Sequence, residues 1–330
     1  MVERKATLLL SANDVARLLE LPNCIAAVER GFLALGENRL PPPQIMALHA
    51  GHGGFHIKAA VWTGEKKYFV AKANANFPQN PKIHGLPTIQ GVIIVCDAGS
   101  GELLALMDSI EITARRTAAA TAVAAKSLAR PESSVLAVCG CGKQGLMHLR
   151  GLLCVLPIQT VYAFDTDEAA RKRFVEEVSS DFKVDVSAVH DVRQAVRNSD
   201  VVATCTTSRQ YFIMADDIRP GTFIAAVGAD SENKHEIDPH LFPMSKVVVD
   251  SLAQCSTIGD LHHAILAGTA TRESVHGELA DVVAGHKPGR TSRSEITLFD
   301  STGVATADAA AAACVYEKAI QMSPNNIFRF

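Results

Sequence analysis

Short apolar runs alternate with longer amphipathic stretches through the middle of the chain. The runs have the length and composition of buried strands and lie at residues 134–139, 159–164, 183–188, 200–204, 223–227 and 245–249. The stretches between the first of them have the apolar spacing of helices, at residues 144–154, 167–178 and 192–198. This alternation predicts a parallel sheet covered by helices, which is an α/β fold.

The first third of the chain has a different pattern. Residues 15–35 have helical apolar spacing after a candidate cap at residues 11–14, and the prolines at 41–43 end that stretch. Strand-like segments follow at residues 55–62, 68–75, 88–97 and 102–107, and a hairpin-turn sequence at 98–101 joins the last two. We therefore expect an antiparallel α+β unit at this end of the chain.

Two alanine-rich segments, 112–128 and 304–320, are predicted to be helices. Their similar composition suggests that they pack together, which would return the C-terminus to the first unit. A chain of 330 residues is also too long for one ordinary core. We expect two domains, one built from residues 1–125 and 304–330 and the other from residues 126–303.

A glycine-rich turn follows the first strand of the α/β part. Gly140, Gly142 and Gly145 form the pattern G-x-G-x-x-G between that strand and a helix, and the next strand ends at Asp165. In a Rossmann doubly wound domain, such glycines let the backbone approach a pyrophosphate, and the acid binds the ribose diol. Because a carboxylate would repel a 2′-phosphate, the cofactor predicted here is NAD rather than NADP.

Composition and charge exclude several other classes of protein. The net charge of −3, without a basic stripe, gives no reason to expect nucleic-acid binding. No apolar run approaches the roughly 20 residues of a membrane span, and the first residues lack a signal-peptide core, so we expect a cytoplasmic protein. The eight cysteines and twelve histidines show no metal-ligand spacing. Free thiols in a reducing compartment, and no metal, are therefore expected.

Five separated motifs, in order, resemble those of the ornithine cyclodeaminase/μ-crystallin family over essentially the whole chain. They are GLPTIQG at 85–91, MDSIEITARRTAA at 107–119, VGADSENKHEID at 227–238, GELADVVAGHKPG at 277–289 and FDSTG at 299–303. The resemblance implies hydride exchange between a nicotinamide and the α-carbon of an amino or imino acid. It also implies a homodimer, with a substrate-binding and dimerisation domain made from both chain ends.

Three residues match catalytic or substrate-binding positions of that family. The resemblance makes Arg116 the ligand of the substrate carboxylate, Lys72 an active-site lysine, and Asp230 a catalytic aspartate. A guanidinium group suits carboxylate binding, and burial of a strand lysine would lower its pKa and make it a candidate proton donor. The alternatives are a surface arginine, which Arg115 fits better, a solvent-facing strand lysine and a helix-capping aspartate.

The resemblance also implies further contacts with cofactor and substrate. Arg116 is expected to reach the cofactor as well, and Thr302 the substrate. The other cofactor-binding residues implied are Thr88, Lys143, Gln144, Thr206, Val227, Gly228, Ala229, Lys234 and Ser301.

One position departs from the family pattern. After the three prolines the family usually has a cation that helps to hold the substrate carboxylate, whereas this chain has Gln44. His56 and Lys58 lie two residues apart, on one face of a predicted strand, and are candidates to replace the missing charge. If both line the pocket, a second substrate carboxylate becomes plausible, as in reduction of iminosuccinate to aspartate; a solvent-facing pair is the alternative.

Three functions follow from these observations. The first is an NAD(H)-dependent imine reductase or amino-acid dehydrogenase that acts on a small 2-imino or 2-amino acid. The second is a cyclodeaminase, which recycles NAD within each turnover and releases ammonia. The third is a non-enzymatic ligand-binding protein like μ-crystallin, which the presence of Lys72, Arg116 and Asp230 together disfavours. Gln44 favours the first over the second.

Overall fold

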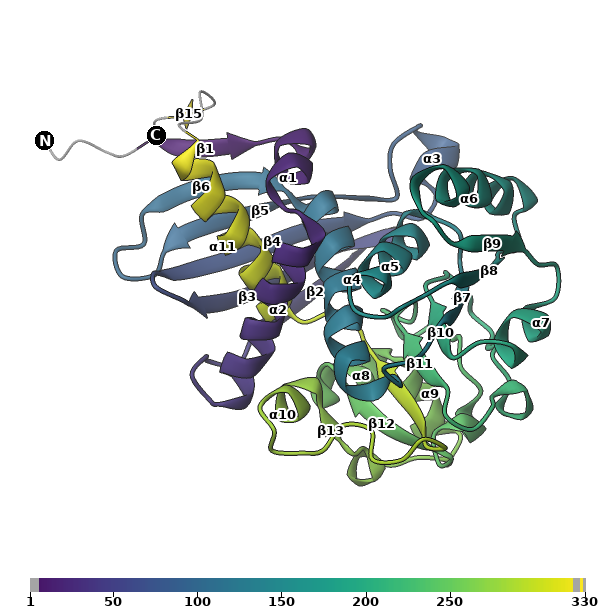
Figure 1. The fold of residues 1–330 in the computed structure, drawn as a ribbon. Helices are drawn as coiled ribbons and strands as arrows, with labels where there is room; N and C mark the ends of the chain where they lie inside the picture. The colour runs from purple at the N-terminus through teal and green to yellow at the C-terminus, as the bar shows by residue number, and fades with distance from the viewer. Residues whose placement is uncertain (1–5, 323–326, 329–330) are drawn as a thin grey trace, which may run out of the picture. The chain divides into compact units, whose positions relative to one another are not determined.

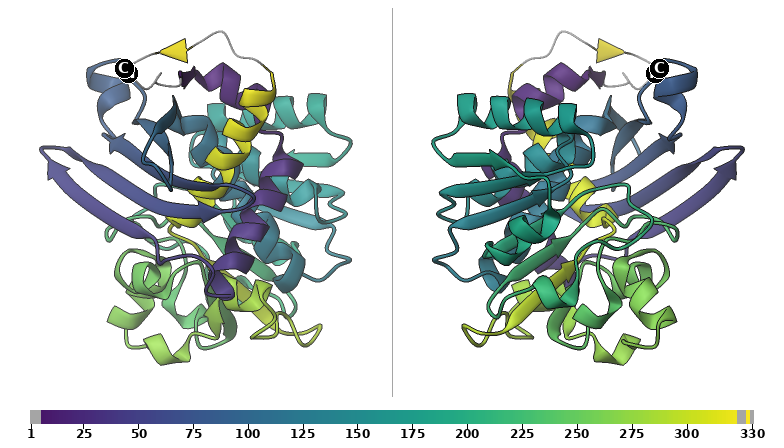
Figure 2. Two further views of the ribbon diagram at one scale, coloured as in Figure 1. Left: turned by 90° about the vertical axis from the view of Figure 1, so that its left-hand side faces the viewer. Right: turned by 90° about the vertical axis from the view of Figure 1, so that its right-hand side faces the viewer.

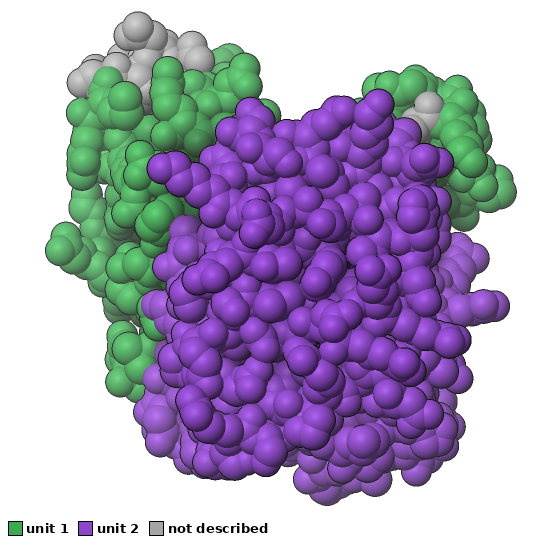
Figure 3. All heavy atoms as spheres, turned by 45° about the vertical axis from the view of Figure 1, so that its right-hand side comes forward, with its two compact units in different colours: residues 1–116, 304–330 green, residues 117–303 purple. Residues whose placement is uncertain are grey.

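A computed structural model describes residues 6–322 and 327–328, and they form two compact units. Unit 1 comprises residues 1–116 and 304–330, and unit 2 comprises residues 117–303 (Figure 3). The division falls within helix α4 (Ser109–Leu128) rather than at 125/126, where the sequence pattern placed it. The first turns of α4 belong to unit 1, since Arg116 binds Asp308 of the C-terminal helix.

Unit 1 is built on a seven-stranded sheet in the order β15-β1-β6-β5-β4-β3-β2 (Figure 1). Strands β2 to β6 form an antiparallel meander, whereas β1 pairs with β6 in parallel. The strands are β1 (Thr7–Leu10), β2 (Gln44–Ala50), β3 (Gly53–Thr63), β4 (Lys67–Asn76), β5 (Ile89–Asp97), β6 (Leu103–Asp108) and β15 (Ile327–Phe328). The sequence pattern did not predict β2, an edge strand whose exposed residues give no alternation between buried and exposed positions.

Helices cover one face of this sheet. Helices α2 (Leu21–Gly36) and α11 (Ala305–Gln321) lie side by side, and α11 packs on β3 and β4 (Figures 1 and 2). The single helix predicted for residues 15–35 is in fact two, because the chain turns at Leu19 and Glu20 between α1 (Ala12–Leu18) and α2, where Pro22 starts the new helix. A short helix, α3 (Asn80–Ile83), follows β4.

The two faces of the sheet differ sharply in exposure. Ala60, Trp62, Tyr68 and Val70 alternate along β3 and β4 and are buried beneath the helices. The alternate positions point to the opposite face, where the apolar side chains Met46, Leu48, Phe55, Phe69 and Val92 are exposed. We call these the inner face and the outer face of the sheet.

Unit 2 contains an eight-stranded, entirely parallel sheet in the order β13-β12-β14-β11-β10-β7-β8-β9. The chain runs outward from β7 through β8 to β9 and then returns to place β10 on the other side of β7. That reversal is the switch point at which doubly wound sheets bind ligands. The strands are β7 (Val135–Cys139), β8 (Thr160–Phe164), β9 (Asp185–Ala188), β10 (Val201–Thr204), β11 (Phe223–Ala226), β12 (Ser245–Val249), β13 (Gly277–Glu278) and β14 (Ile296–Asp300).

Helices connect these strands, as the alternating pattern predicted, and the predicted α/β class is confirmed. They are α5 (Lys143–Leu153), α6 (Glu168–Asp181), α7 (Val192–Arg197), α8 (Leu252–Ile258), α9 (Asp260–Leu266) and α10 (Leu279–Val283), with 3₁₀ turns at Ala215–Asp217, Pro239–Leu241 and Arg272–Ser274. None of the helices in the described part of the chain is long and apolar enough to cross a membrane.

The turn between β7 and α5 leads to a prediction about stability. A methyl group on Gly145 would overlap the carbonyl oxygen of Gly140, whereas one on Gly142 would meet nothing within 4 Å. We expect Gly145→Ala to lower the free energy of unfolding by about 1–3 kcal/mol, as overpacking does. The matched variant Gly142→Ala is expected to change it by less than about 0.5 kcal/mol. Urea unfolding without ligand tests this, and equal effects in the two variants would contradict it.

Candidate active site

The predicted cofactor turn lies at the carboxyl end of β7. Gly140 has a φ of +105°, a left-handed conformation that favours glycine, and a side chain there would press on the Cys205 carbonyl. Gly142 caps the N-terminus of α5. The backbone can therefore approach a ligand closely at the positive end of a helix, which is the arrangement that binds a pyrophosphate.

A pocket of about 430 Å³ adjoins this turn. Gly140, Gly142 and Asp165 line it, together with residues 205–208 after β10. Asp165 Oδ2 accepts a hydrogen bond of 2.8 Å from the Cys141 amide, which holds the carboxylate beside the glycines. The turn, the acid and the adjacent strand end thus surround one cavity at the switch point, as a dinucleotide requires.

Glu236 ties the neighbouring strand ends together. This buried carboxylate accepts hydrogen bonds from the Thr204 hydroxyl (2.7 Å), the Thr206 amide and hydroxyl (2.6 Å each) and the Gly228 amide (2.8 Å). Burial raises the pKa of Glu236, while these donors favour its ionised form. The loops that follow β10 and β11, which carry the predicted Thr206 and Gly228, are therefore fixed by one side chain.

Asp230 lies two residues beyond Gly228, at the carboxyl end of β11. Its Oδ1 accepts a hydrogen bond of 2.6 Å from Lys234 Nζ, and its side chain remains about 44% exposed. The structure thus brings the predicted catalytic aspartate into contact with a predicted cofactor-binding lysine.

Buried Asp250 organises the segment after β14. It accepts hydrogen bonds from the Ser301 hydroxyl (2.8 Å) and the Gly303 amide (2.6 Å), and the Thr302 hydroxyl lies 3.5 Å away. Ser301 and Thr302, both predicted site residues, are therefore held at the carboxyl edge of the same sheet as the glycine turn.

In unit 1 the central feature is a buried carboxylate shared by two cations. Asp308 of α11 lies 2.8 Å from Lys72 Nζ of β4, and its Oδ1 accepts a 2.8 Å hydrogen bond from Arg116 Nε of α4. All three side chains are nearly inaccessible to solvent. Arg116 therefore contacts Asp308 through the Nε edge of its guanidinium group.

The surroundings of Lys72 bring the pKa of its ammonium group close to 7. Burial, together with the charges of Arg116 and Lys58, lowers the pKa of Lys72 to about 7, and Asp308 opposes that shift. Burial would raise the pKa of Asp308, but Arg116, Lys72 and Lys58 together hold it below its usual value. Asp308 therefore stays ionised, and Lys72 is able to give up or accept a proton near pH 7.

The strand register separates the other substrate-site candidates. Lys58 is paired directly with Lys72 and His56 with Asn74, so all four belong to the inner face. Gln44 is paired with Ala59, which places it on the outer face, where its amide donates to the Pro42 carbonyl at 3.3 Å. The structure therefore brings His56 and Lys58 to the face that carries Lys72, and it does not bring Gln44 there.

The remaining predicted residues lie at element ends. Thr88 is half-buried just before β5 in unit 1, and its carbonyl accepts a hydrogen bond from the Phe77 amide. Lys143 and Gln144 begin α5, and the Gln144 side-chain oxygen is buried without a hydrogen-bond partner. Val227 and Ala229 flank Gly228. Arg115, the alternative to Arg116, contacts Glu111 and the Leu19 carbonyl instead.

Asp308, Glu236 and Asp250 were not among the residues predicted from the sequence. A lone acid in the apolar, alanine-rich stretch 304–315 was a usable signal for Asp308, because such a position is buried and a buried carboxylate needs a partner. Glu236 stands two residues after Lys234 in a quoted motif, but nothing local distinguishes it from a surface acid.

The described residues were compared with the requirements of metal sites and disulfides. No group of three or more His, Cys, Asp or Glu side chains in that part of the chain is arranged to hold a metal ion. The eight cysteines are free thiols. Burial raises the pKa of the Cys139 and Cys205 thiols, which lie near the glycine turn, so they are poor nucleophiles.

Known proteins resemble this chain over nearly its whole length. The chain is 37% identical to an alanine dehydrogenase of Archaeoglobus fulgidus over 98% of both chains. The structure of an archaeal alanine dehydrogenase dimer with bound NAD matches with a TM-score of 0.94 and 35% identity, covering 99% of this chain and all of the other. The iminosuccinate reductase of Paracoccus denitrificans in complex with NAD⁺ matches with a TM-score of 0.87 and 29% identity, covering 97% and 98%. A model of the ornithine cyclodeaminase/mu-crystallin family matches residues 5–323, and the chain belongs to that family.

Proposed function

We propose that the protein is an NAD(H)-dependent imine reductase or amino-acid dehydrogenase, which interconverts a small 2-imino acid and the 2-amino acid. The observation that carries the proposal is the buried Lys72–Asp308–Arg116 cluster, which combines a carboxylate-binding cation with a lysine that titrates near neutrality. The archaeal alanine dehydrogenase and the iminosuccinate reductase support the same class of reaction.

The residues of unit 2 fit NAD. The amides around Gly142 would hold the pyrophosphate, and Asp165 would hold the adenosine ribose and disfavour a 2′-phosphate. Thr206, Lys234 and Ser301 are proposed as further contacts, on loops fixed by Glu236 and Asp250. When bound, NADH supplies the hydride for the α-carbon.

The residues of unit 1 would bind and protonate the substrate. Arg116 would hold the α-carboxylate through its Nη groups, because Asp308 fixes its Nε edge. Lys72 would donate a proton to the imine nitrogen as the carbon is reduced, and Asp308 keeps the ammonium charged and aligned. Asp230 is proposed to exchange protons with the substrate amine, with Lys234 holding the carboxylate in place.

A screen of NADH oxidation tests the proposed reaction directly. We expect 2-oxo acids with ammonia, or 2-imino acids, to oxidise NADH, and we expect NADPH to be used less well because of Asp165. The screen should include oxaloacetate, pyruvate and glyoxylate, each with and without ammonia. Ammonia release from ornithine, with no acceptor oxidising NADH, would instead identify a cyclodeaminase.

The pH dependence of the rate of reduction is expected to follow the protonation of Lys72. We expect the rate of reduction to fall as pH rises through about 7, where Lys72 loses the proton that it must donate. Asp308→Asn removes the anion that stabilises the ammonium, so its falling limb should lie at lower pH than that of the wild-type enzyme.

The protonation of ammonia depends on pH in the same way in the wild-type and Asp308→Asn assays. The difference between the two pH profiles therefore comes from the enzyme. The exposed acid Asp216 supplies a control, Asp216→Asn, which should leave the profile unchanged. Asp308→Glu should return the falling limb of the pH profile part of the way to its wild-type position. If the falling limb does not move in Asp308→Asn, the proposed effect of Asp308 on the pKa of Lys72 is refuted.

We also propose that the protein is a cytoplasmic homodimer joined through the outer face of the unit 1 sheet. NADH and free thiols suit the cytoplasm. The outer face carries contiguous exposed apolar side chains on β2 to β5, including Met46 at 48% exposure and Phe55 at 45%. Apolar patches of this kind mark protein interfaces, and the archaeal alanine dehydrogenase is a dimer.

Met46→Glu should weaken that dimer, because the new carboxylate would be buried without a partner. We expect at least a tenfold rise in the dimer dissociation constant, about 1.4 kcal/mol, measured by sedimentation equilibrium. The control is Met244→Glu in unit 2, where the methionine is similarly exposed (56%). Equal effects of the two substitutions would exclude the outer face as the interface.

A further inference from the structure

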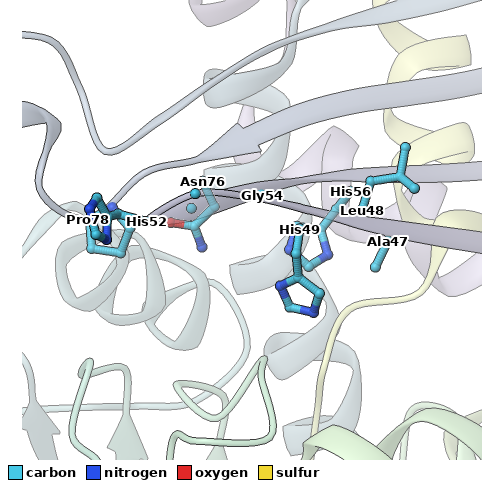
Figure 4. A pocket seen from close by; sticks show the side chains of 10 residues that line it. Ala47, Leu48, His49, His52, Gly54, His56, Asn76 and Pro78 are labelled. Carbon is cyan, nitrogen blue, oxygen red and sulfur yellow. The ribbon is translucent and has the colours of Figure 1, made fainter.

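Histidine side chains of the described residues form two groups. In unit 1, a cavity at the tip of the β2–β3 hairpin is lined by His49, His52 and His56 (Figure 4). In unit 2, His235 follows β11, and helix α9 carries His262 and His263. The unit 2 group lies next to residues 230–234, which carry Asp230 and Lys234 and which we call the Asp230 turn. The reaction proposed above gives these histidines no role.

The rings of His235 and His263 are stacked on each other. Their centroids lie 3.9 Å apart, and their planes differ by only 10°. Tyr211 packs on His235 with a centroid distance of 5.1 Å, and His262 meets His263 at 5.3 Å with its ring nearly perpendicular. Because stacked rings at this distance are in van der Waals contact, the segment after β11 is packed directly on α9.

Each of the two rings also donates a hydrogen bond to a backbone carbonyl of that segment. His263 Nε2 lies 2.8 Å from the Lys234 carbonyl oxygen, and His235 Nε2 lies 2.9 Å from that of Ile237. Since a carbonyl oxygen only accepts, Nε2 carries the hydrogen in both rings. Burial lowers the pKa of both histidines; for His235 the neighbouring His263 adds to the shift and Asp238 opposes it, which leaves a pKa of about 4. Both rings are therefore neutral at pH 7, and each donates its single N–H to the backbone.

Helix α9 holds the chain after β11 at two points. Buried Asp260, the first residue of the helix, accepts hydrogen bonds at Oδ1 from the amides of Glu236 (2.8 Å) and Ile237 (3.0 Å). His263 lies one turn further along the helix and binds the Lys234 carbonyl. Asp260 thus anchors the residue whose carboxylate orders the cofactor loops, and His263 anchors the end of the Asp230 turn.

His263 supplies a contact that the Asp230 turn does not make within itself. In the turn, the Asp230 amide donates to the Gly228 carbonyl and the Lys234 amide to the Ser231 carbonyl, which are local bonds. Residues 231–233 are half-buried or exposed, so packing alone gives them little support. Lys234 Nζ lies 2.6 Å from Asp230 Oδ1, so a displacement of Lys234 would also displace the Asp230 carboxylate.

We propose that His263, stacked on His235 and bonded to the Lys234 carbonyl, is a positioning residue that holds Asp230 where it can exchange protons with the substrate amine. The inference rests on the reductase function and on the role of Asp230 proposed above. His263 acts through the Asp230 turn rather than on the reacting atoms. Since a displacement of about 1 Å in a reacting group can lower a rate about 100-fold, loss of this support is expected to affect kcat.

His263→Ala removes both the stacking and the hydrogen bond. With ammonia, NADH and the best acceptor among oxaloacetate, pyruvate and glyoxylate, we expect kcat to fall by about tenfold or more. The dissociation constant of NADH, measured by its fluorescence, should change by less than about threefold, because the amides around Gly142 and Asp165 are untouched. His286→Ala, at an exposed histidine after α10, is the matched control and should leave both quantities unchanged.

Two conservative variants each keep one of the two contacts. His263→Gln retains an N–H donor for the Lys234 carbonyl, and His263→Phe retains a ring that can stack on His235. Both should have kcat values between those of His263→Ala and the wild-type enzyme. If His263→Ala folds poorly, His263→Phe takes its place in the measurements below.

A double-mutant cycle with Asp230→Asn separates positioning from a general loss of structure. If His263 acts through Asp230, His263→Ala should lower kcat by less than about twofold once Asp230 is already asparagine. A merely structural role would lower kcat by the same factor in both backgrounds. Single-turnover oxidation of NADH, with the enzyme in excess, allows the low residual rates to be followed.

The outcomes distinguish this inference from the function on which it rests. A wild-type kcat in His263→Ala, or equal losses in the two backgrounds, would overturn the positioning role and leave the reductase function and the role of Asp230 intact. Full kcat in Asp230→Asn would overturn the role of Asp230 and this inference with it. Failure of every 2-oxo acid to oxidise NADH would instead overturn the reductase function itself.

Discussion

The ion pairs of Asp308 allow Lys72 and Arg116 to be buried together in unit 1. Two cations could not be buried side by side in an apolar interior without an anion, because each would lose its hydration without compensation. Asp308 supplies that anion, and in doing so it joins β4, α4 and α11, elements that come from distant parts of the chain. The same contact that holds the C-terminal helix on the sheet also sets the charge of the lysine beneath it. The packing of α11 and the pKa of Lys72 therefore depend on one side chain.

Unit 2 uses buried carboxylates in a different way. Glu236 and Asp250 contact backbone amides and hydroxyls at the carboxyl ends of parallel strands, where the chain leaves the sheet and its amides need acceptors. A carboxylate accepts several hydrogen bonds at once, so one side chain can fix two loops. The loops around Thr206, Gly228 and Ser301 are thereby arranged before any ligand arrives, which reduces the entropy that binding would cost.

Local patterns predicted a large part of this structure. The parallel α/β domain is confirmed, since its strands and helices follow from hydrophobic spacing, and the glycine turn with Asp165 is a short-range signal. Partners that lie far apart in sequence escaped prediction. Lys72 and Asp308 are separated by 236 positions, and no local sequence feature of either residue indicates that the other is its partner. The edge strand β2 was missed because its exposed residues lack alternation, and with it the register that places Gln44 on the outer face. The roles of the individual site residues remain predictions.

The alternation along β3 and β4 has a consequence for how such a protein can evolve. Successive residues of these strands point to opposite faces of the sheet. In β3, Phe55, Ile57 and Ala59 face outward, whereas His56, Lys58 and Ala60 face inward. An inserted or deleted residue within either strand would exchange the two sets, so that inward-facing side chains would turn outward and outward-facing ones inward. Point substitution at every second position can therefore change one face of the sheet and leave the other unaltered. Changes of length are confined to the turns, such as Gly51 and His52 between β2 and β3, where they would alter the tip of the hairpin and leave the rest of the sheet in register.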